Sequence, residues 1–89
     1  DSHLSLNNLA SGKISASGAS VISTGGWGTI TNAGTITNTG TGTVIAAADG
    51  TIRVTNAAGG TMATAAGHTA IAVGETLELV NQGTIIGDI

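Results

Sequence analysis

The sequence predicts an all-β protein, and specifically a short right-handed β-solenoid (β-helix) of three or four coils. The first observation is alternation: residues 29–31 and 35–37 both read Thr-Ile-Thr, which is a polar–apolar–polar pattern. Such alternation is typical of strands that bury one face, and β-branched Thr and Ile suit a pleated surface. Glycine-containing turns follow both triplets, whereas no segment offers a convincing helix.

The second observation is an internal repeat. An apolar residue, then Asn, then Gly-Thr-apolar after a turn occurs four times, around Asn32, Asn38, Asn56 and Asn81. The last three asparagines lie 18 and 25 residues apart, and a period of about twenty fits one solenoid coil. The step from Asn32 to Asn38 is too short for a coil, so it marks two sides of one coil or a β-hairpin. A small β-sandwich or meander is therefore the alternative fold.

The chain is expected to be one domain or a fragment of a longer one. Residues 28–89 carry the solenoid repeats, and residues 1–27 read as an irregular β segment that caps them. Asp1 at the start indicates a processed terminus or a cut fragment. Residues 85–89 include no obvious polar cap, so we expect that end to continue into a longer solenoid or to meet another copy.

The composition predicts a thin hydrophobic core. The 89 residues include 15 glycines, one Trp, one Met and no Cys, and small side chains bury little apolar area. Repetition, stacking or a partner chain is therefore expected to complete the core. The net charge of −3 argues against nucleic acid. The longest apolar run, residues 44–48, argues against membrane insertion.

The side chains with chemical reactivity form no recognisable catalytic pattern. His3 and His68 lie far apart in the sequence and have no metal-ligand spacing, and without Cys there is no thiolate site. On a strand, Glu75 and Glu78 would point to opposite faces, so they read as solvated charges. No nucleophile elbow or phosphate-binding loop occurs. We therefore expect a protein that is not an enzyme and that uses no cofactor or metal.

Two kinds of residue stand out as structural or contact candidates. Each asparagine of the repeat, Asn32, Asn38, Asn56 and Asn81, follows a predicted strand. Stacked in successive coils they would form a ladder of side-chain amides; alternatively, Asn simply tolerates a left-handed turn there. Trp27, the only aromatic residue, is expected either to plug the core or to act as an exposed contact residue.

Two segments carry a family resemblance. Residues 67–71, Gly-His-Thr-Ala-Ile, and residues 77–87, which include Asn-Gln-Gly-Thr-Ile-Ile-Gly, resemble the repeats of bacterial autotransporter passenger domains. The resemblance covers roughly residues 28–89. It implies a right-handed β-helix displayed outside the cell, in a family that often acts in adhesion, aggregation or host contact. Residues 66–74 are also similar to one head repeat of trimeric autotransporter adhesins.

The leading functional hypothesis is therefore a bacterial extracellular or cell-surface structural and adhesive element that displays a repetitive β surface. Its expected partners are other protein chains, in a homo-oligomer or filament, and a host-surface ligand. The alternative is a self-assembling subunit of a surface fibre, pilus or phage particle, completed by strand pairing between chains. A further alternative is an ice-binding β-solenoid, suggested by the Thr-x-Thr rows at 29–31 and 35–37, which residues 51–53 do not continue.

Overall fold

A computed structural model describes residues 3–25 and 27–89 of the chain, and this part contains eleven β-strands and no helix. The first coil comprises β1 (His3–Asn8), β2 (Lys13–Ala16) and β3 (Ser20–Thr24). The second comprises β4 (Trp27–Asn32), β5 (Thr35–Asn38) and β6 (Thr43–Ala47). The third comprises β7 (Thr51–Asn56), β8 (Thr61–Ala63) and β9 (Ile71–Val73). An incomplete fourth coil adds β10 (Thr76–Asn81) and β11 (Thr84–Ile86).

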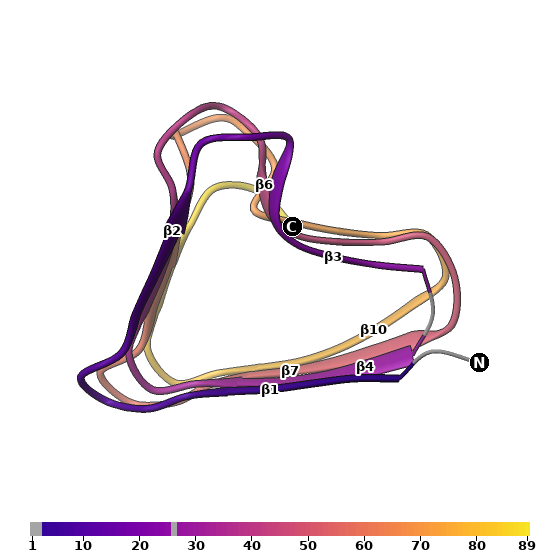
Figure 1. Cartoon of the computed structure of the whole chain (residues 1–89), viewed down its shortest axis with the longest axis horizontal. Coiled ribbons are helices and arrows are strands. Elements are labelled where there is room, and N and C mark those ends of the chain that lie inside the picture. The colour runs from indigo at the N-terminus through magenta and orange to yellow at the C-terminus, as the bar shows by residue number, and fades with distance from the viewer. Residues whose placement is uncertain (1–2, 26) are drawn as a thin grey trace.

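The strands form three parallel sheets that enclose a triangular core (Figure 1). Sheet A has the order β1-β4-β7-β10, sheet B has β11-β8-β5-β2, and sheet C has β3-β6-β9. Every pair between these strands is parallel, and neighbours in a sheet come from successive coils. The prediction of a β-solenoid is thus confirmed. The two Thr-Ile-Thr triplets lie in β4 and β5, on two sides of one coil, and do not form a hairpin.

The coil is longer than the period of about twenty that the repeat suggested. In sheet A, Asn8 pairs with Asn32, Asn32 with Asn56 and Asn56 with Asn81, so successive coils span 24, 24 and 25 residues. The sequence comparison aligned Asn38 with Asn56, but Asn38 lies in sheet B. The repeated motif recurs on two sides of the triangle, which shortens the apparent period.

Residues 3–24 differ from the irregular capping segment expected for residues 1–27. They form a full coil whose three strands pair in register with those of the second coil. The predicted division at residue 28 falls inside β4, and the same three sheets continue through it. In β1, Leu and Ser stand where β4 has Ile and Thr. The inward–outward alternation is kept, but the sequence repeat cannot be recognised.

The core consists of inward-facing residues stacked in columns along the solenoid axis. The largest fully buried apolar side chains are Ile30, Ile36, Ile45, Ile52, Met62, Val44 and Val54. Burying one such side chain contributes roughly 1.5–3 kcal/mol. The apolar residues that are only partly buried lie toward the two ends of the stack: Leu4, Leu6, Ile14 and Val21 at one end, and Val73, Leu77, Leu79 and Ile85 at the other. The inner coils are therefore covered on both sides, and the two end coils on one side only.

Successive coils approach closely at the corner between sheets A and B, where Gly34 lies. A Cβ added to Gly34 would stand 2.3 Å from the carbonyl oxygen of Gly12 and 2.4 Å from that of Leu9. Both obstacles are backbone atoms of the preceding coil, so they cannot rotate away. We expect Gly34→Ala to lower the free energy of unfolding by about 1–3 kcal/mol in urea denaturation.

Gly18→Ala is the matched control for Gly34→Ala. A Cβ on Gly18 meets nothing within 4 Å, so this variant should unfold at nearly the wild-type urea concentration. Equal denaturation midpoints for the two variants would contradict the close approach of the coils at this corner.

Candidate functional site

The most regular polar feature of the interior is a row of asparagine side chains, one per coil. The row lies at the corner between sheets A and B, where the strands of sheet A end. Asn8 Nδ2 donates to Asn32 Oδ1 at 2.9 Å, and Asn32 Nδ2 donates to Asn56 Oδ1 at 3.0 Å. Asn56 Nδ2 donates to Asn81 Oδ1 at 2.9 Å. The side chains of Asn32 and Asn56 are fully buried, and that of Asn81 is exposed. All four amides point in the same sense along the axis.

Backbone groups fix the orientation of these amides. Asn32 Nδ2 donates to the carbonyl oxygens of Gly34 and Thr61 at 3.1 and 3.0 Å, and the Gly34 N–H donates to Asn32 Oδ1 at 3.2 Å. An NH2 group only donates and an amide oxygen only accepts, so a flipped side chain would lose all three bonds. Among the described residues no buried side-chain nitrogen or oxygen lacks a hydrogen-bond partner.

The row includes three of the four asparagines singled out in the sequence. Asn32, Asn56 and Asn81 lie in it, whereas Asn38 lies at the next corner, between sheets B and C. There Asn38 Nδ2 donates to the carbonyl oxygens of Gly18 and Thr43 at 3.0 and 2.8 Å, and its Oδ1 accepts from the Gly40 N–H at 2.9 Å. Asn38 thus closes its own turn and also joins it to the preceding coil.

Sequence reasoning missed Asn8 because no Gly-Thr-apolar motif follows it. A four-residue corner separates Asn8 from Lys13, and only the sequence Gly12-Lys13-Ile14 resembles the motif. The turn interpretation of the asparagines required a left-handed backbone. No residue other than glycine has a positive φ in the described part of the chain, so the asparagines there serve as hydrogen-bonding side chains.

Trp27 lies at the start of β4 and is 51% exposed. In the register of sheet A, Trp27 pairs with His3 of the first coil. A side chain that is half in solvent does not plug the core. The interpretation as an exposed contact residue stays a prediction.

The outer faces present polar columns with interruptions. On sheet B, Thr35, Thr61 and Thr84 stand in register, but the adjacent column continues from Thr37 to Ala63 and Ile86. On sheet A, Arg53 Nε lies 3.2 Å from Glu78 Oε1, and both side chains are exposed. An ion pair in solvent contributes about 0–1 kcal/mol. The described Thr-x-Thr array is thus one row deep in sheets A and B.

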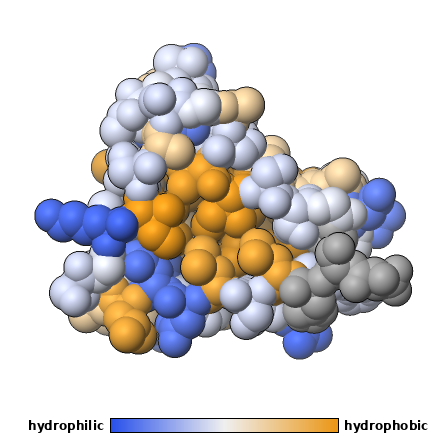
Figure 2. Space-filling view, in the orientation of Figure 1, coloured by the Kyte–Doolittle hydropathy of each residue, from blue (hydrophilic) through white to orange (hydrophobic). Residues whose placement is uncertain are grey.

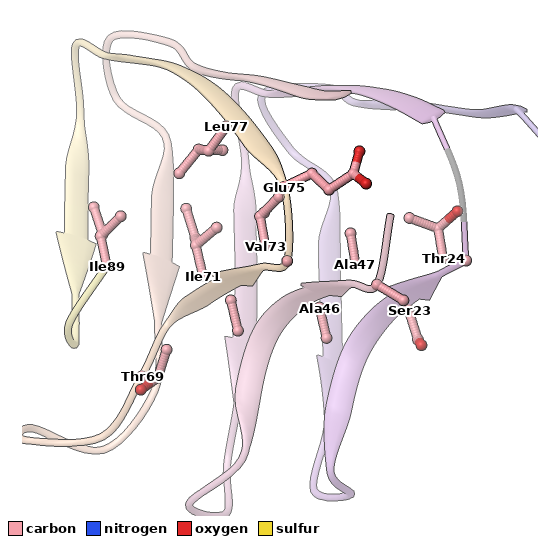
Figure 3. A pocket seen from close by; sticks show the side chains of 14 residues that line it. Ser23, Thr24, Ala46, Ala47, Thr69, Ile71, Val73, Glu75, Leu77 and Ile89 are labelled. Atoms are coloured by element: carbon pink, nitrogen blue, oxygen red, sulfur yellow. The ribbon is translucent and has the colours of Figure 1, made fainter. Parts of the chain in front are cut away.

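An open hollow of about 870 Å³ runs beside sheet C and reaches the incomplete fourth coil. Figure 3 shows Ile71, Val73 and Leu77 around it, with Ala47 and Thr24 further along the axis. Its walls are mostly apolar. The one carboxylate at its edge, that of Glu75, accepts a hydrogen bond from the Gly50 N–H at 3.1 Å. Such a lining can accommodate an apolar group or a strand, but it brings no set of reactive groups together.

The titratable side chains remain dispersed. Glu78 pairs with Arg53, and Glu75 contacts the Gly50 backbone. His68 lies in an exposed turn. Across residues 3–25 and 27–89, no group of three or more His, Cys, Asp or Glu residues is placed to hold a metal ion. In the same residues, no helix has the length and apolar character to cross a membrane.

Both ends of the described stack present apolar side chains. The first coil faces the viewer in Figure 2, where an apolar centre lies inside a more polar rim. This centre corresponds to the partly buried residues Leu4, Leu6, Ile14 and Val21. At the other end, β10 and β11 are the last described strands of sheets A and B. Both ends therefore present strand edges together with apolar side chains.

Comparisons of the chain with models of protein families, with curated proteins and with solved structures found no match. The resemblance to autotransporter passenger repeats accordingly stays a prediction from the sequence.

Proposed function

We propose that this chain is a non-catalytic structural and adhesive element of a bacterial cell surface, which displays the outer faces of a stiff β-solenoid outside the cell. The supporting observation is the in-register stacking of three sheets, which aligns the outward side chains in columns at one-coil intervals. Thr35, Thr61 and Thr84 form such a column. A periodic, polar and rigid surface suits contact with another repetitive surface at little cost in conformational entropy.

Trp27 is the residue to test first in an adhesive contact. It is a large, half-exposed side chain on the mostly polar outer face of sheet A, and exposed Trp residues are enriched among the dominant contributors to binding. Trp27→Thr introduces the residue type found at Thr51 in the next coil. Val80→Thr is the matched control, because Val80 is 52% exposed on the same sheet and its neighbour in β7 is Thr55.

The experiment measures retention of the fluorescently labelled chain on cultured epithelial cells and on immobilised extracellular-matrix proteins. We expect Trp27→Thr to reduce binding by tenfold or more, with an unchanged urea midpoint, because a binding hot spot contributes about 2 kcal/mol or more. Val80→Thr should bind like the wild type. Absence of binding to every surface, or equal binding by all three proteins, would count against the adhesive role.

The second candidate function is a self-assembling subunit completed by strand pairing between chains. The observation that favours it is the pair of apolar ends described above. Ice binding has weaker support, since Ala63 and Ile86 interrupt the second threonine column of sheet B. The absence of thermal hysteresis in the purified protein would exclude that alternative.

A further inference from the structure

We propose that copies of this chain stack head to tail, with the first coil of one copy seated on the fourth coil of the next. The inference rests on the self-assembling candidate and specifies its partner, its two faces and its polarity. Four independent features of the ends support this arrangement: the apolar columns, the backbone donors and acceptors, the amide row and the alternating corner lengths.

The apolar columns of the core would continue through the contact. Within the chain, Leu77 stacks on Ile52 and Leu79 stacks on Val54. The first coil presents Leu4 and Leu6 at the corresponding positions of sheet A, since Leu4 pairs with Gly28, the neighbour of Ile52, and Leu6 pairs with Ile30. Seating β1 of a second copy on β10 therefore places Leu4 over Leu77 and Leu6 over Leu79. In sheet B, Ile14 takes the place over Ile85 in the same way.

The backbone gives the two ends opposite hydrogen-bonding character at the corner between sheets A and B. There each coil donates N–H groups to the preceding coil: Ala33 to Asn8 and Ala57 to Asn32 at 2.8 Å, and Gln82 to Asn56 at 2.7 Å. The last coil accordingly offers the Asn81 carbonyl oxygen, and the first offers the Leu9 N–H. Two like ends would face donor with donor or acceptor with acceptor, which leaves these groups unpaired.

The amide row has the same polarity. At one end Asn81 Nδ2 donates to no acceptor of the described residues, and at the other Asn8 Oδ1 accepts from no described donor. Between coils, each Nδ2 reaches the Oδ1 of the following coil at 2.9–3.0 Å. Head-to-tail stacking would bring Asn81 Nδ2 to Asn8 Oδ1 of the next copy and so extend the row without a break.

The corner lengths alternate along the stack. Residues 9–12 and 57–60 form four-residue corners, and residues 33–34 and 82–83 form two-residue corners. A fifth coil in this alternation would carry a four-residue corner, which is what the first coil of another copy supplies.

The size of the contact sets the conditions of the test. Seen down its axis the stack measures 30 × 24 Å, and its triangular outline fills only part of that rectangle, so the contact area per copy is well below the ~800 Å² of a standard interface. Sheet C has one described strand fewer than sheets A and B, so strand pairing is confined to sheets A and B. We expect assembly on the order of 10–100 μM chain.

The experiment is sedimentation velocity from 1 μM to 1 mM with electron microscopy of the same samples, using two blocking variants. Leu6→Arg places a charge on the first coil, and Leu79→Arg places one in the same column of the fourth coil. Wild-type protein should form particles that lengthen with concentration, because a head-to-tail contact along one axis does not form a closed ring or dimer and leaves both ends free to add further copies. Each variant alone should remain monomeric, and an equimolar mixture should stop at a heterodimer.

Other outcomes would overturn the inference. Dimers of one variant alone would mean that like ends meet, and undiminished assembly of both would mean lateral association. A wild-type chain that stays monomeric at 1 mM would exclude stacking but leave the proposed adhesive role, which the Trp27→Thr binding assay tests separately.

A second measurement covers the case in which an arginine variant fails to fold. Leu9 and Gln82 are exposed corner residues that would be neighbours across the contact, and the chain has no native Cys. Strands one coil apart lie about 4.8 Å from each other, which suits a disulfide. Oxidation of the Leu9→Cys/Gln82→Cys double variant should give a ladder of linked oligomers, and each single variant should give dimers at most. Monomers from the oxidised double variant would contradict the stacked geometry.

Discussion

Asn56→Asp is expected to lower the free energy of unfolding at pH 7 by about 3–5 kcal/mol, because it leaves an uncompensated charge in the core. Asn56 Nδ2 donates to the carbonyl oxygens of Gly60 and Thr84 at 3.2 and 3.0 Å, and to Asn81 Oδ1 at 2.9 Å. A carboxylate oxygen in its place would face three acceptors and bring no proton. The residue is fully buried, so water cannot compensate.

The pH dependence gives this prediction a second readout. Burial among acceptors favours the protonated carboxyl group, so the folded-state pKa of the introduced acid should rise above its ordinary value of about 3.9. The loss of stability should be complete above that raised pKa, and it should shrink as the pH falls toward about 4. Urea unfolding at several pH values, with the wild type measured in parallel, tests this.

Asn81→Asp is the matched control for charge. Asn81 is the exposed end of the row, and its Oδ1 already acts as the acceptor of Asn56 Nδ2 and of the Gly83 N–H. A carboxylate can accept both bonds, so we expect a change within about 1 kcal/mol. If Asn56→Asp were as mild as Asn81→Asp, the amide row would have to lie open to solvent.

Ile30→Ala is expected to lower the free energy of unfolding by about 2–5 kcal/mol. Ile30 is fully buried in the second coil, between Leu6 of the first coil and Val54 of the third. Removing its side chain leaves a cavity between two neighbours that are held by strand pairing and cannot close around it. Urea unfolding at a chain concentration where the protein is monomeric measures the loss.

Leu6→Ala tests whether the position in the stack decides the loss. Leu6 belongs to the same column as Ile30 but lies in the end coil and is only partly buried. Because folding removes less apolar area of Leu6 from water, we expect the free energy of unfolding to fall by a smaller amount, about 1–2 kcal/mol. Equal losses for the two variants would mean that the ends are as well covered as the middle, contrary to an open-ended stack.

The fold was predictable because its local signals agree with one another. The alternation of Thr and Ile in β4 and β5, with Asn and Gly at the corners, predicts strands and turns from propensity alone. The coil length was not predictable from the same sequence motifs. The motif Ile-Thr-Asn ends both β4 and β5, and only the strand register distinguishes a residue in the next coil from one on the next side.

The amide row was only partly predictable for a similar reason. A repeat of Asn before Gly indicates a structural role, but whether the side chain joins the amide row depends on which sheet its strand belongs to. Asn38 carries the motif but bonds to backbone groups of its own corner and of the preceding coil, whereas Asn8 lacks the motif and begins the row. The exposure of Trp27 had no sequence signal either, because the glycines around it suit a turn and a strand end equally.

The most direct test of the account is nuclear magnetic resonance detection of contacts between the side-chain amides of the row. The parallel, in-register stack predicts cross-peaks from Asn32 to Asn8 and to Asn56, together with slow hydrogen exchange at Asn32 and Asn56. A different result would contradict the solenoid. Methyl contacts that place Ile30 directly opposite Ile36, together with fast hydrogen exchange of the Asn32 and Asn56 side-chain amides, would indicate an antiparallel hairpin.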